Sequence, residues 1–432
     1  MKNRFQTMIK RIALLGMSVF LLAGAWAQEP VRAPFLSSAD DRQCRQWVDS
    51  VMSRMNLHEK IGQLLVPKVM AVETKETKKQ VKEWVKKYKV GGLLFGKGTP
   101  EEQAILTNLA QKTARVPLMM TFDGEWGLSM RLGDVPVYPR NAALGCITDN
   151  SLIEDYGREV ARQLRELGVR VNFAPVADVN TNPLNPVINE RSFGENPALV
   201  AGKVVAYGKG LESGGVLSVA KHFPGHGDTD SDSHKELPLV WGDRARLDSV
   251  ELYPFKAAVQ AGLGGVMVAH LHVPAVEPDS LLPSSLSPKV VTSLLKEELG
   301  FRGLVFTDAL DMKGVTATPG RYTAAVLAGN DVLLVQFSPK EASDELVAAV
   351  RSGKLPESVV DERCRKVLTY KYLLGLRGKQ PKLQISGLGY RIRTEEAQDL
   401  ASRLRKASVT VLDNYFDVLP LAADRSKIAV LS

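Results

Sequence analysis

The sequence predicts an α/β protein built on a (β/α)8 barrel, and three observations point to this fold. Eight short apolar runs recur along the chain at spacings too long for β-hairpins. Segments with the periodicity of amphipathic helices lie between several of these runs. Polar residues follow most runs at the point where a strand would end. This alternation favours parallel strands closed into a barrel, with a doubly wound sheet as the weaker alternative.

The first 27 residues have the pattern of a secretory signal peptide. Four basic residues precede an apolar segment over 12–22, and Ala25-Trp26-Ala27 provides a cleavage site before Gln28. The apolar segment is shorter than a comfortable membrane span, so we expect an exported, periplasmic protein without stable membrane insertion after cleavage. Removal of these four basic residues lowers the formal net charge from +8 to +4, which is too weak to indicate nucleic-acid binding.

The predicted elements of the barrel follow in order, and the barrel is expected to cover residues 28–376. Helices are predicted over 39–56, 75–89, 152–167, 196–213, 246–261 and 356–376, from apolar residues that recur on one face. The eight predicted strands cover 62–66, 92–95, 117–121, 169–174, 216–220, 265–269, 303–307 and 331–335. Each run is short and apolar enough to be a buried parallel strand.

A different pattern follows the barrel. Residues 377–393 contain glycine and lysine and are predicted to be a linker. A helix over 394–406 and strand-like segments over 407–412 and 427–431 come next. We therefore expect residues 394–432 to be the start of a truncated α/β sandwich domain, with the rest of that domain missing after Ser432.

Charged and imidazole side chains stand at the ends of five predicted strands. They are Asp123, Asp178, Lys221 with His222, His270 with His272, and Asp308. Because all strands of a barrel open their carboxyl ends on one face, we expect these side chains to converge. The densest segment, 221–234, holds three of the six histidines, and Gly225 and Gly227 within it favour a shaped loop.

The histidines and cysteines do not predict a metal site. Cys44, Cys146 and Cys364 are far apart and odd in number, and no helical H-E-x-x-H motif is present. His270 and His272 are interpreted as pocket lining or as hydrogen-bonded core histidines. No metal ion and no cofactor is therefore expected.

Several ordered motifs resemble those of the family 3 glycoside hydrolases, and more narrowly those of their β-N-acetylglucosaminidase branch. The motifs are Lys221-His222-Phe223-Pro224-Gly225-His226-Gly227 followed by Asp232-Ser233-His234, then Pro283-Ser284-Ser285-Leu286-Ser287 and Phe306-Thr307-Asp308-Ala309-Leu310-Asp311-Met312. Segments 123–131 and 189–194 add to the resemblance, which extends over residues 45–375. One departure is Glu125-Trp126-Gly127, where the family usually has Glu-Gly-Gly.

The resemblance implies roles for individual residues. Asp308 would be the nucleophile that forms a covalent glycosyl-enzyme, and His234 the general acid/base, assisted by Asp232. The positions that hold the sugar next to the scissile bond match Asp123, Arg131, Arg191, Lys221 and His222. A carboxylate beside an imidazole favours the protonated, proton-donating ring, so the Asp232–His234 pair suits the second role in a retaining mechanism.

The sequence therefore predicts a retaining β-N-acetylhexosaminidase that releases terminal β-linked N-acetylglucosamine from glycans. The favoured carbohydrate substrate is a peptidoglycan fragment. The alternatives are a β-glucosidase or β-xylosidase of the same family, and a β-N-acetylglucosaminide phosphorylase. A non-catalytic glycan-binding protein is disfavoured, because Asp308 and His234 are both present.

Overall fold

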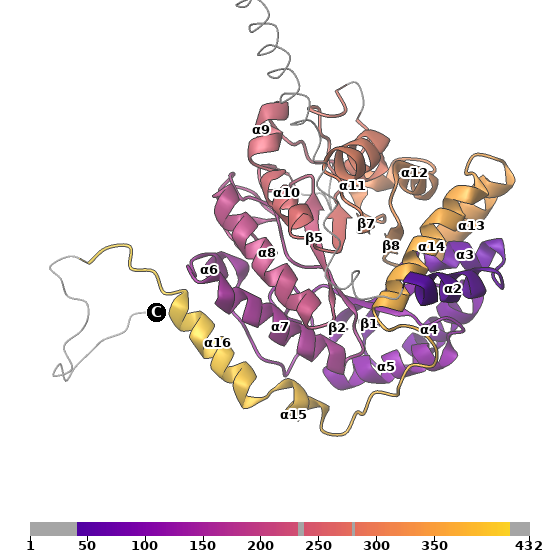
Figure 1. Ribbon diagram of the computed structural model, residues 1–432, viewed down its shortest axis with the longest axis horizontal. Helices are drawn as coiled ribbons and strands as arrows, with labels where there is room; N and C mark the ends of the chain where they lie inside the picture. The colour runs from indigo at the N-terminus through magenta and orange to yellow at the C-terminus, as the bar shows by residue number, and fades with distance from the viewer. Residues whose placement is uncertain (1–40, 232–236, 279–280, 415–432) are drawn as a thin grey trace, which may run out of the picture. The chain divides into compact units, whose positions relative to one another are not determined.

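The computed structural model describes residues 41–231, 237–278 and 281–414, and these form a closed barrel of eight parallel strands (Figure 1). The strands are β1 (Leu65–Ala71), β2 (Gly92–Gly98), β3 (Met119–Phe122), β4 (Val171–Asn172), β5 (Leu217–Phe223), β6 (Gly265–Val268), β7 (Leu304–Ala309) and β8 (Val332–Val335). Each strand pairs with the next along the chain, and β8 closes the barrel onto β1. The predicted (β/α)8 barrel is confirmed.

Helices follow the strands and surround them (Figure 1). The longer ones are α2 (Asp41–Met52), α3 (Leu57–Gln63), α4 (Lys75–Lys87), α5 (Pro100–Thr113), α7 (Asn150–Glu166), α8 (Pro197–Ser213), α9 (Arg244–Ser249), α10 (Tyr253–Gln260), the π-helix η5 (Lys289–Glu298), α12 (Arg321–Ala328), α13 (Pro339–Arg351) and α14 (Glu357–Leu373). Two shorter helices are α6 (Asn141–Gly145) and α11 (Lys313–Thr316). Within the described ranges, none of the helices combines the length and apolar character that crossing a bilayer requires.

The barrel interior is a packed core of its own. Inward-facing side chains from the strands fill it, and Phe173 and Phe306 meet edge to face with their ring centroids 5.4 Å apart. Tyr370 and Leu374 from the end of α14, with Leu376 just beyond it, join the same cluster. The amino-terminal end of the barrel is therefore filled by α14, while the polar strand ends lie at the other end.

The first strand lies further along the chain than predicted. Residues 62 and 63 belong to α3, which begins at a capping box between Asn56 and Glu59, and the strand starts only at Leu65. The glycine that suggested a strand boundary serves close packing instead, because a Cβ at Gly62 would lie 2.3 Å from the Tyr88 carbonyl oxygen. The predicted bounds of 62–66 are thus wrong, because the strand covers Leu65–Ala71 instead.

The predicted helix over 246–261 is two helices, α9 and α10. Pro254 stands in the first turn of α10, where its missing N–H is tolerated and its fixed φ suits a helix start. A proline within one continuous helix would instead remove a hydrogen bond and clash with the preceding turn. The break in the helix therefore follows from this proline.

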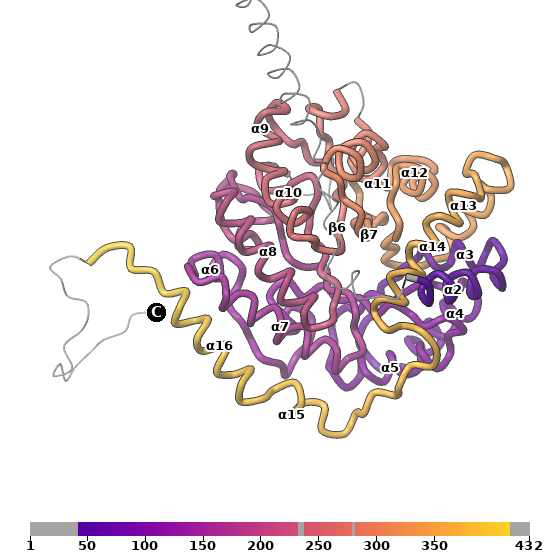
Figure 2. Tube along the Cα trace, viewed as in Figure 1, coloured from indigo at the N-terminus to yellow at the C-terminus, as the bar shows by residue number. Residues whose placement is uncertain are grey.

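The segment after the barrel packs back onto helix α7. It contains α15 (Leu388–Ile392), inside the predicted linker, and α16 (Glu395–Ala407), which matches the predicted helix over 394–406. Arg162 of α7 donates to the Arg391 carbonyl oxygen at 2.6 Å, and Arg391 pairs with Glu166 at 2.7 Å. In Figure 2, α15 lies against α5 and α7, and α16 lies alongside α7.

Beyond α16, residues 408–414 form no strand, so the strand expected over 407–412 is absent from the described chain. An apolar run becomes a strand only when another strand satisfies its backbone groups, and Val411 and Leu412 are exposed here. The strand expected over 427–431 and the signal peptide over 1–27 lie outside the described residues. The assignment of 394–432 to a second domain stays a prediction.

The inner core yields a test of the fold. Replacing Phe306, which is fully buried, with alanine should lower the free energy of unfolding by about 3–5 kcal/mol, because it leaves a cavity in the barrel centre. The matched control is Phe337→Ala at a side chain that is 73% exposed, and it should change that free energy by less than ~0.5 kcal/mol. Guanidinium denaturation measures both, and equal midpoints for the two variants would contradict the described core.

Candidate active site

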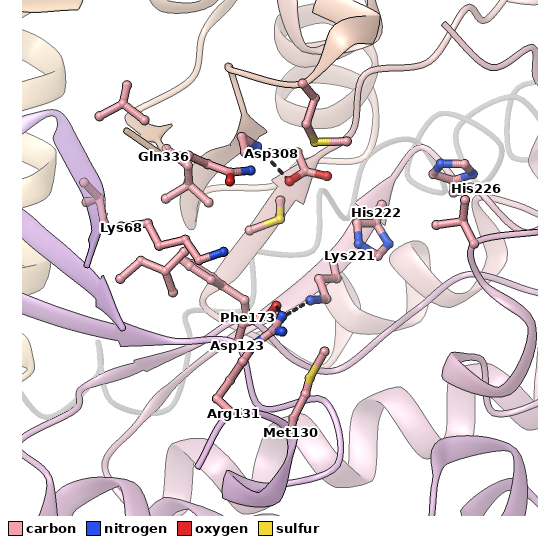
Figure 3. Close-up of a pocket in the computed structure, with 18 of the residues that line it drawn as sticks. Lys68, Asp123, Met130, Arg131, Phe173, Lys221, His222, His226, Asp308 and Gln336 are labelled. Carbon is pink, nitrogen blue, oxygen red and sulfur yellow. Dashed lines mark hydrogen bonds and ion pairs between the residues drawn. The ribbon is translucent and has the colours of Figure 1, made fainter. Parts of the chain in front are cut away.

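The polar strand ends converge on one cavity of about 240 Å³ at the carboxyl end of the barrel (Figure 3). Six of the eight predicted site residues line it, namely Asp123, Arg131, Arg191, Lys221, His222 and Asp308. Apolar side chains, among them Phe173, Met267 and Leu334, complete the lining. The two remaining predicted residues, Asp232 and His234, lie outside the described residues. The convergence that the strand-end pattern predicted is therefore present for Asp123, Lys221, His222 and Asp308, whereas Asp178, His270 and His272 do not line the cavity.

Asp123 holds two cations at once. It follows β3 directly, and its Oδ1 accepts from the Lys221 ammonium at 2.6 Å, while its Oδ2 pairs with Arg131. Burial alone would raise the pKa of the Asp123 carboxyl, but the charges of Lys221 and Arg131 hold that pKa well below its usual range. Asp123 is therefore ionised and ties β3 to β5.

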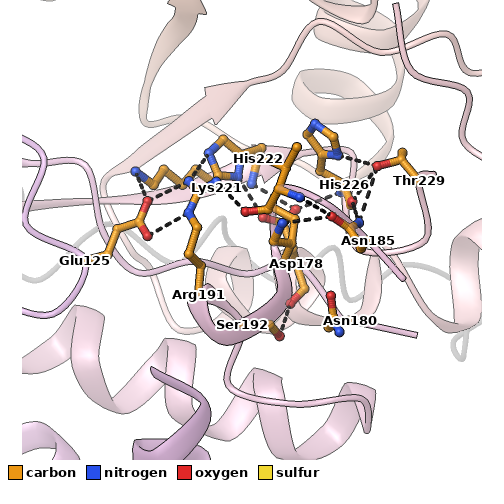
Figure 4. A network of polar contacts seen from close by, with 12 residues as sticks. Glu125, Asp178, Asn180, Asn185, Arg191, Ser192, Lys221, His222, His226 and Thr229 are labelled. Atoms are coloured by element: carbon orange, nitrogen blue, oxygen red, sulfur yellow. Dashed lines mark hydrogen bonds and ion pairs between the residues drawn. The ribbon is translucent and has the colours of Figure 1, made fainter. Parts of the chain in front are cut away.

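A second buried carboxylate, Glu125, continues this chain of charges (Figure 4). Its two oxygens accept from Arg191 at 2.7 and 2.9 Å, and Lys221 lies 2.7 Å from Oε1. Burial alone would raise the pKa of Glu125, but Arg191 and Lys221 lower it to about 2. Lys221 therefore bridges two carboxylates, and a continuous network runs Arg131–Asp123–Lys221–Glu125–Arg191.

His222 is oriented by Asp178, which lies on the segment after β4. The His222 Nδ1 stands 2.6 Å from Asp178 Oδ2, and its Nε2 stands 3.2 Å from the Arg191 guanidinium. Burial alone would raise the pKa of Asp178, but His222 and a backbone N–H from His226 help to lower it to about 2. Nδ1 of His222 therefore faces Asp178 and Nε2 faces Arg191, which fixes the orientation of the ring.

His226 also lines the cavity, although it was not among the predicted site residues. Its Nδ1 lies 2.6 Å from the Thr229 hydroxyl, and its backbone carbonyl oxygen accepts from Asn185 at 2.8 Å. Burial lowers the pKa of His226 to about 4, so the ring is neutral near pH 7. These bonds fix the start of the loop that leads to Asp232 and His234.

Asp308 differs from the other two carboxylates in the cavity region because no cation neutralises it directly. Within residues 41–231, 237–278 and 281–414, no lysine or arginine lies within ion-pair distance of Asp308. Its Oδ1 accepts from the Ala309 backbone N–H at 2.7 Å. Burial would raise the pKa of the Asp308 carboxyl, but His222, His270 and that N–H together lower it. Asp308 thus presents an ionised, uncommitted carboxylate to the cavity.

His270 is hydrogen-bonded to the backbone of Ala309, the residue next to Asp308. One ring nitrogen lies 2.7 Å from the Ser285 hydroxyl, and the other donates to the Ala309 carbonyl oxygen at 3.0 Å. The interpretation of His270 as a hydrogen-bonded core histidine is confirmed. In the described chain, no group of three histidine, cysteine or acidic side chains is arranged to hold a metal ion.

Three residues of this region were not among the predicted site residues: Lys68 and Gln336 line the cavity, and Glu125 pairs with Arg191 and Lys221 of its lining. Glu125 lies two residues after Asp123, and its burial was the missing piece of information. Lys68 comes two residues after the predicted strand over 62–66, and in the structure it lies within β1 and lines the cavity. Gln336 directly follows β8, and no charged residue stands at that strand end in the sequence. Their positions depend on strand registers that the apolar pattern does not fix.

The comparison with known proteins identifies related sequences and structures. The model of the glycosyl hydrolase family 3 N-terminal domain matches residues 56–370. Beta-hexosaminidase A of Pseudoalteromonas piscicida is 32% identical over 79% of this chain, but the match covers only 62% of that protein, less than two thirds of its length. Beta-hexosaminidase LpqI of Mycobacterium bovis is 34% identical, over 81% of this chain and 90% of that protein.

A solved structure resembles the fold closely as well. The family 3 β-N-acetylglucosaminidase of a Paenibacillus species superposes with a TM-score of 0.75 and 36% identity, over 82% of this chain and 69% of that one. The family model covers nearly all of the barrel, from α3 to α14, including every described residue of the cavity. The chain therefore belongs to glycosyl hydrolase family 3.

Proposed function

We propose that the protein is an exported, retaining β-N-acetylhexosaminidase that hydrolyses terminal β-linked N-acetylglucosamine through a covalent glycosyl-Asp308 intermediate. The observation that carries the proposal is the state of Asp308, which faces the cavity as an ionised carboxylate without an ion-pair partner among the described residues. A nucleophile needs a free lone pair, and a carboxylate held by a lysine or arginine would have to break that pair first.

The rest of the cavity suits a sugar held by its hydroxyl groups. Asp123 can accept hydrogen bonds, while Arg131, Lys221 and His222 add polar groups on the neighbouring walls. The Arg131–Asp123–Lys221–Glu125–Arg191 network holds these side chains in place before a ligand arrives. Binding of a sugar therefore costs little additional side-chain entropy. A fixed sugar would present its anomeric carbon to Asp308.

The second catalytic role falls to His234, with Asp232 as its partner. His234 is eight residues after His226, which lines the cavity, and eight residues can span up to ~26 Å. A histidine near the leaving oxygen would donate a proton in the first step and activate water in the second. An adjacent Asp232 carboxylate would favour the protonated ring.

The nature of the sugar rests on the relatives. Two of the similar proteins carry the name beta-hexosaminidase, and the similar Paenibacillus structure is described as a β-N-acetylglucosaminidase. Together with the signal-peptide pattern over 1–27, this favours peptidoglycan fragments met in the periplasm as substrates. Glucosides, xylosides and phosphorolysis are the competing outcomes.

A parallel assay tests the proposed activity. Nitrophenyl β-N-acetylglucosaminide should be hydrolysed with a kcat/KM at least about 10-fold above those of the β-glucoside and β-xyloside, because a pocket that recognises a polar substituent discriminates against substrates without it. Each substrate is measured with and without inorganic phosphate. Preference for the glucoside, or phosphate-dependent release of a sugar 1-phosphate, would overturn the assignment.

The nucleophile has its own test. Asp308→Asn should reduce kcat by about 10⁴-fold or more while keeping the unfolding midpoint, because an amide cannot form the ester intermediate. The control is Asp344→Asn, an exposed carboxylate on α13, which should leave kcat unchanged. A 2-fluoro sugar with a good leaving group should label Asp308 in the parent enzyme, and mass spectrometry of the peptides locates the label. A label on Asp311 would instead identify that residue, three positions further along the chain, as the nucleophile.

A leaving-group series tests His234. His234→Gly should impair substrates with poor leaving groups most, since these need protonation, and should spare the first step for dinitrophenyl substrates. The intermediate should then accumulate, and azide should restore turnover by forming a glycosyl azide. Rates are measured across aryl leaving groups with and without azide. A uniform loss that azide does not relieve would show that His234 only holds the sugar.

A further inference from the structure

Lys68 is a cavity residue to which the proposed mechanism gives no role. It stands on β1 beside Leu94 of β2, and its half-buried side chain points into the cavity (Figure 3). Gly96 of β2 lies beside the lysine stem, since a Cβ at that glycine would touch Lys68 Cε at 3.4 Å, and it leaves room for Met70, whose sulfur such a Cβ would approach to 2.8 Å. The lysine stem is thus accommodated inside the barrel mouth rather than extended into solvent.

Four charged cavity residues come from alternate strands, the arrangement by which inward side chains form layers in such barrels. Lys68 belongs to β1, Asp123 follows β3, Lys221 belongs to β5 and Asp308 to β7. In a ring of eight strands in sequence order, β1 stands opposite β5, and β3 stands opposite β7. The two cations therefore face each other across the cavity, as do the two carboxylates.

Lys68 differs from the other cations of the cavity because it is unpaired. Arg131, Lys221 and Arg191 each contact Asp123 or Glu125. Across the described ranges, Lys68 has neither a carboxylate within ion-pair distance nor a side-chain hydrogen bond. Burial and the nearby Arg131 both lower the pKa of the Lys68 ammonium, with Asp123 opposing them. A half-buried charge without a partner is unfavourable until a ligand supplies the opposite charge.

The ring of charges indicates where that ligand charge would lie, and this step rests on the proposed function. With the anomeric carbon at Asp308, the opposite C4 end of the sugar lies toward Asp123, and the two long edges of the ring face β5 and β1. The β5 wall offers Lys221 and His222, and Arg191 from the segment after β4 lies beside His222. These polar groups suit the edge with substituents at both C2 and C3. The β1 wall offers Lys68, which suits the edge whose one exocyclic group is at C6.

We propose that Lys68 is a specificity-determining residue that binds a compact oxyanion on O6 of the terminal sugar, so that 6-O-sulfated or 6-O-phosphorylated hexosaminides are preferred substrates. The ammonium contributes a charge-assisted hydrogen bond to the ester oxyanion. Sulfate and phosphate esters share this chemistry. A neutral 6-hydroxyl group would leave the Lys68 ammonium without a partner of opposite charge.

The test compares matched substrates. Nitrophenyl β-N-acetylglucosaminide, its 6-sulfate, its 6-phosphate and its 3-O-lactyl ether are assayed with the parent enzyme, Lys68→Met, Lys68→Arg and Lys97→Met. We expect the parent enzyme to favour a 6-oxyanion in kcat/KM by about 10- to 100-fold, the worth of one charge-assisted hydrogen bond. Lys68→Met should abolish this preference, and Lys68→Arg should retain part of it. Lys97→Met, at an exposed neighbour, should leave the preference unchanged. The two esters show which oxyanion is preferred.

Other results would overturn the inference. These are the absence of any preference for a 6-oxyanion in the parent enzyme, a preference that survives Lys68→Met, a preference for the 3-O-lactyl ether instead, and an equal loss for neutral and anionic substrates in Lys68→Met. The last result would make Lys68 a ligand for a neutral hydroxyl group.

A binding measurement separates failure of this inference from failure of the proposed function. Calorimetric titration with free N-acetylglucosamine 6-sulfate needs no turnover. If none of the substrates is hydrolysed, the proposed function fails, and tighter binding to the parent protein than to Lys68→Met would still support the anion site. Equal binding to both proteins would overturn it.

Discussion

The cavity depends on one interaction, the bridge that Lys221 makes between the Asp123 and Glu125 carboxylates. Two buried carboxylates within reach of each other repel, and each loses hydration on burial, so neither would stay ionised alone. A single ammonium between them, with an arginine on the far side of each, satisfies both. Removing any member would leave a buried charge unmatched, which makes the five residues a unit rather than separate contacts.

The pairing within this unit separates the structural residues of the cavity from those that are available to a ligand. The residues within it are committed to each other, so they hold the segments after β3 and β4 against β5 and keep a fixed shape. Among the described residues that line the cavity, Asp308 and Lys68 are the two charged side chains outside this unit, and neither has an ion-pair partner there. Reactivity and recognition are thus available because other side chains carry the structural role.

Much of this could be predicted from the sequence, for physical reasons that differ by element. The strands at β5 and β7 are apolar runs that end abruptly in polar residues, so both the barrel and the convergence of Lys221 and Asp308 follow from the pattern. The start of β1 could not be found this way, because a short helix with its own cap precedes it and the boundary glycine serves packing. Lys68 follows the predicted strand by two residues, whereas the structure places it within β1 and in the cavity. Glu125 was visible in the sequence, but its pairing with Arg191 joins residues 66 positions apart and needs the fold to be recognised.

The filling of the barrel by the end of α14 has a consequence for how a polymer could be handled. Tyr370, Leu374 and Leu376 pack against the strand side chains beneath the cavity, so a chain of sugars cannot thread through the barrel. A ligand can therefore enter and leave the cavity only by the face of the barrel at which the strands end.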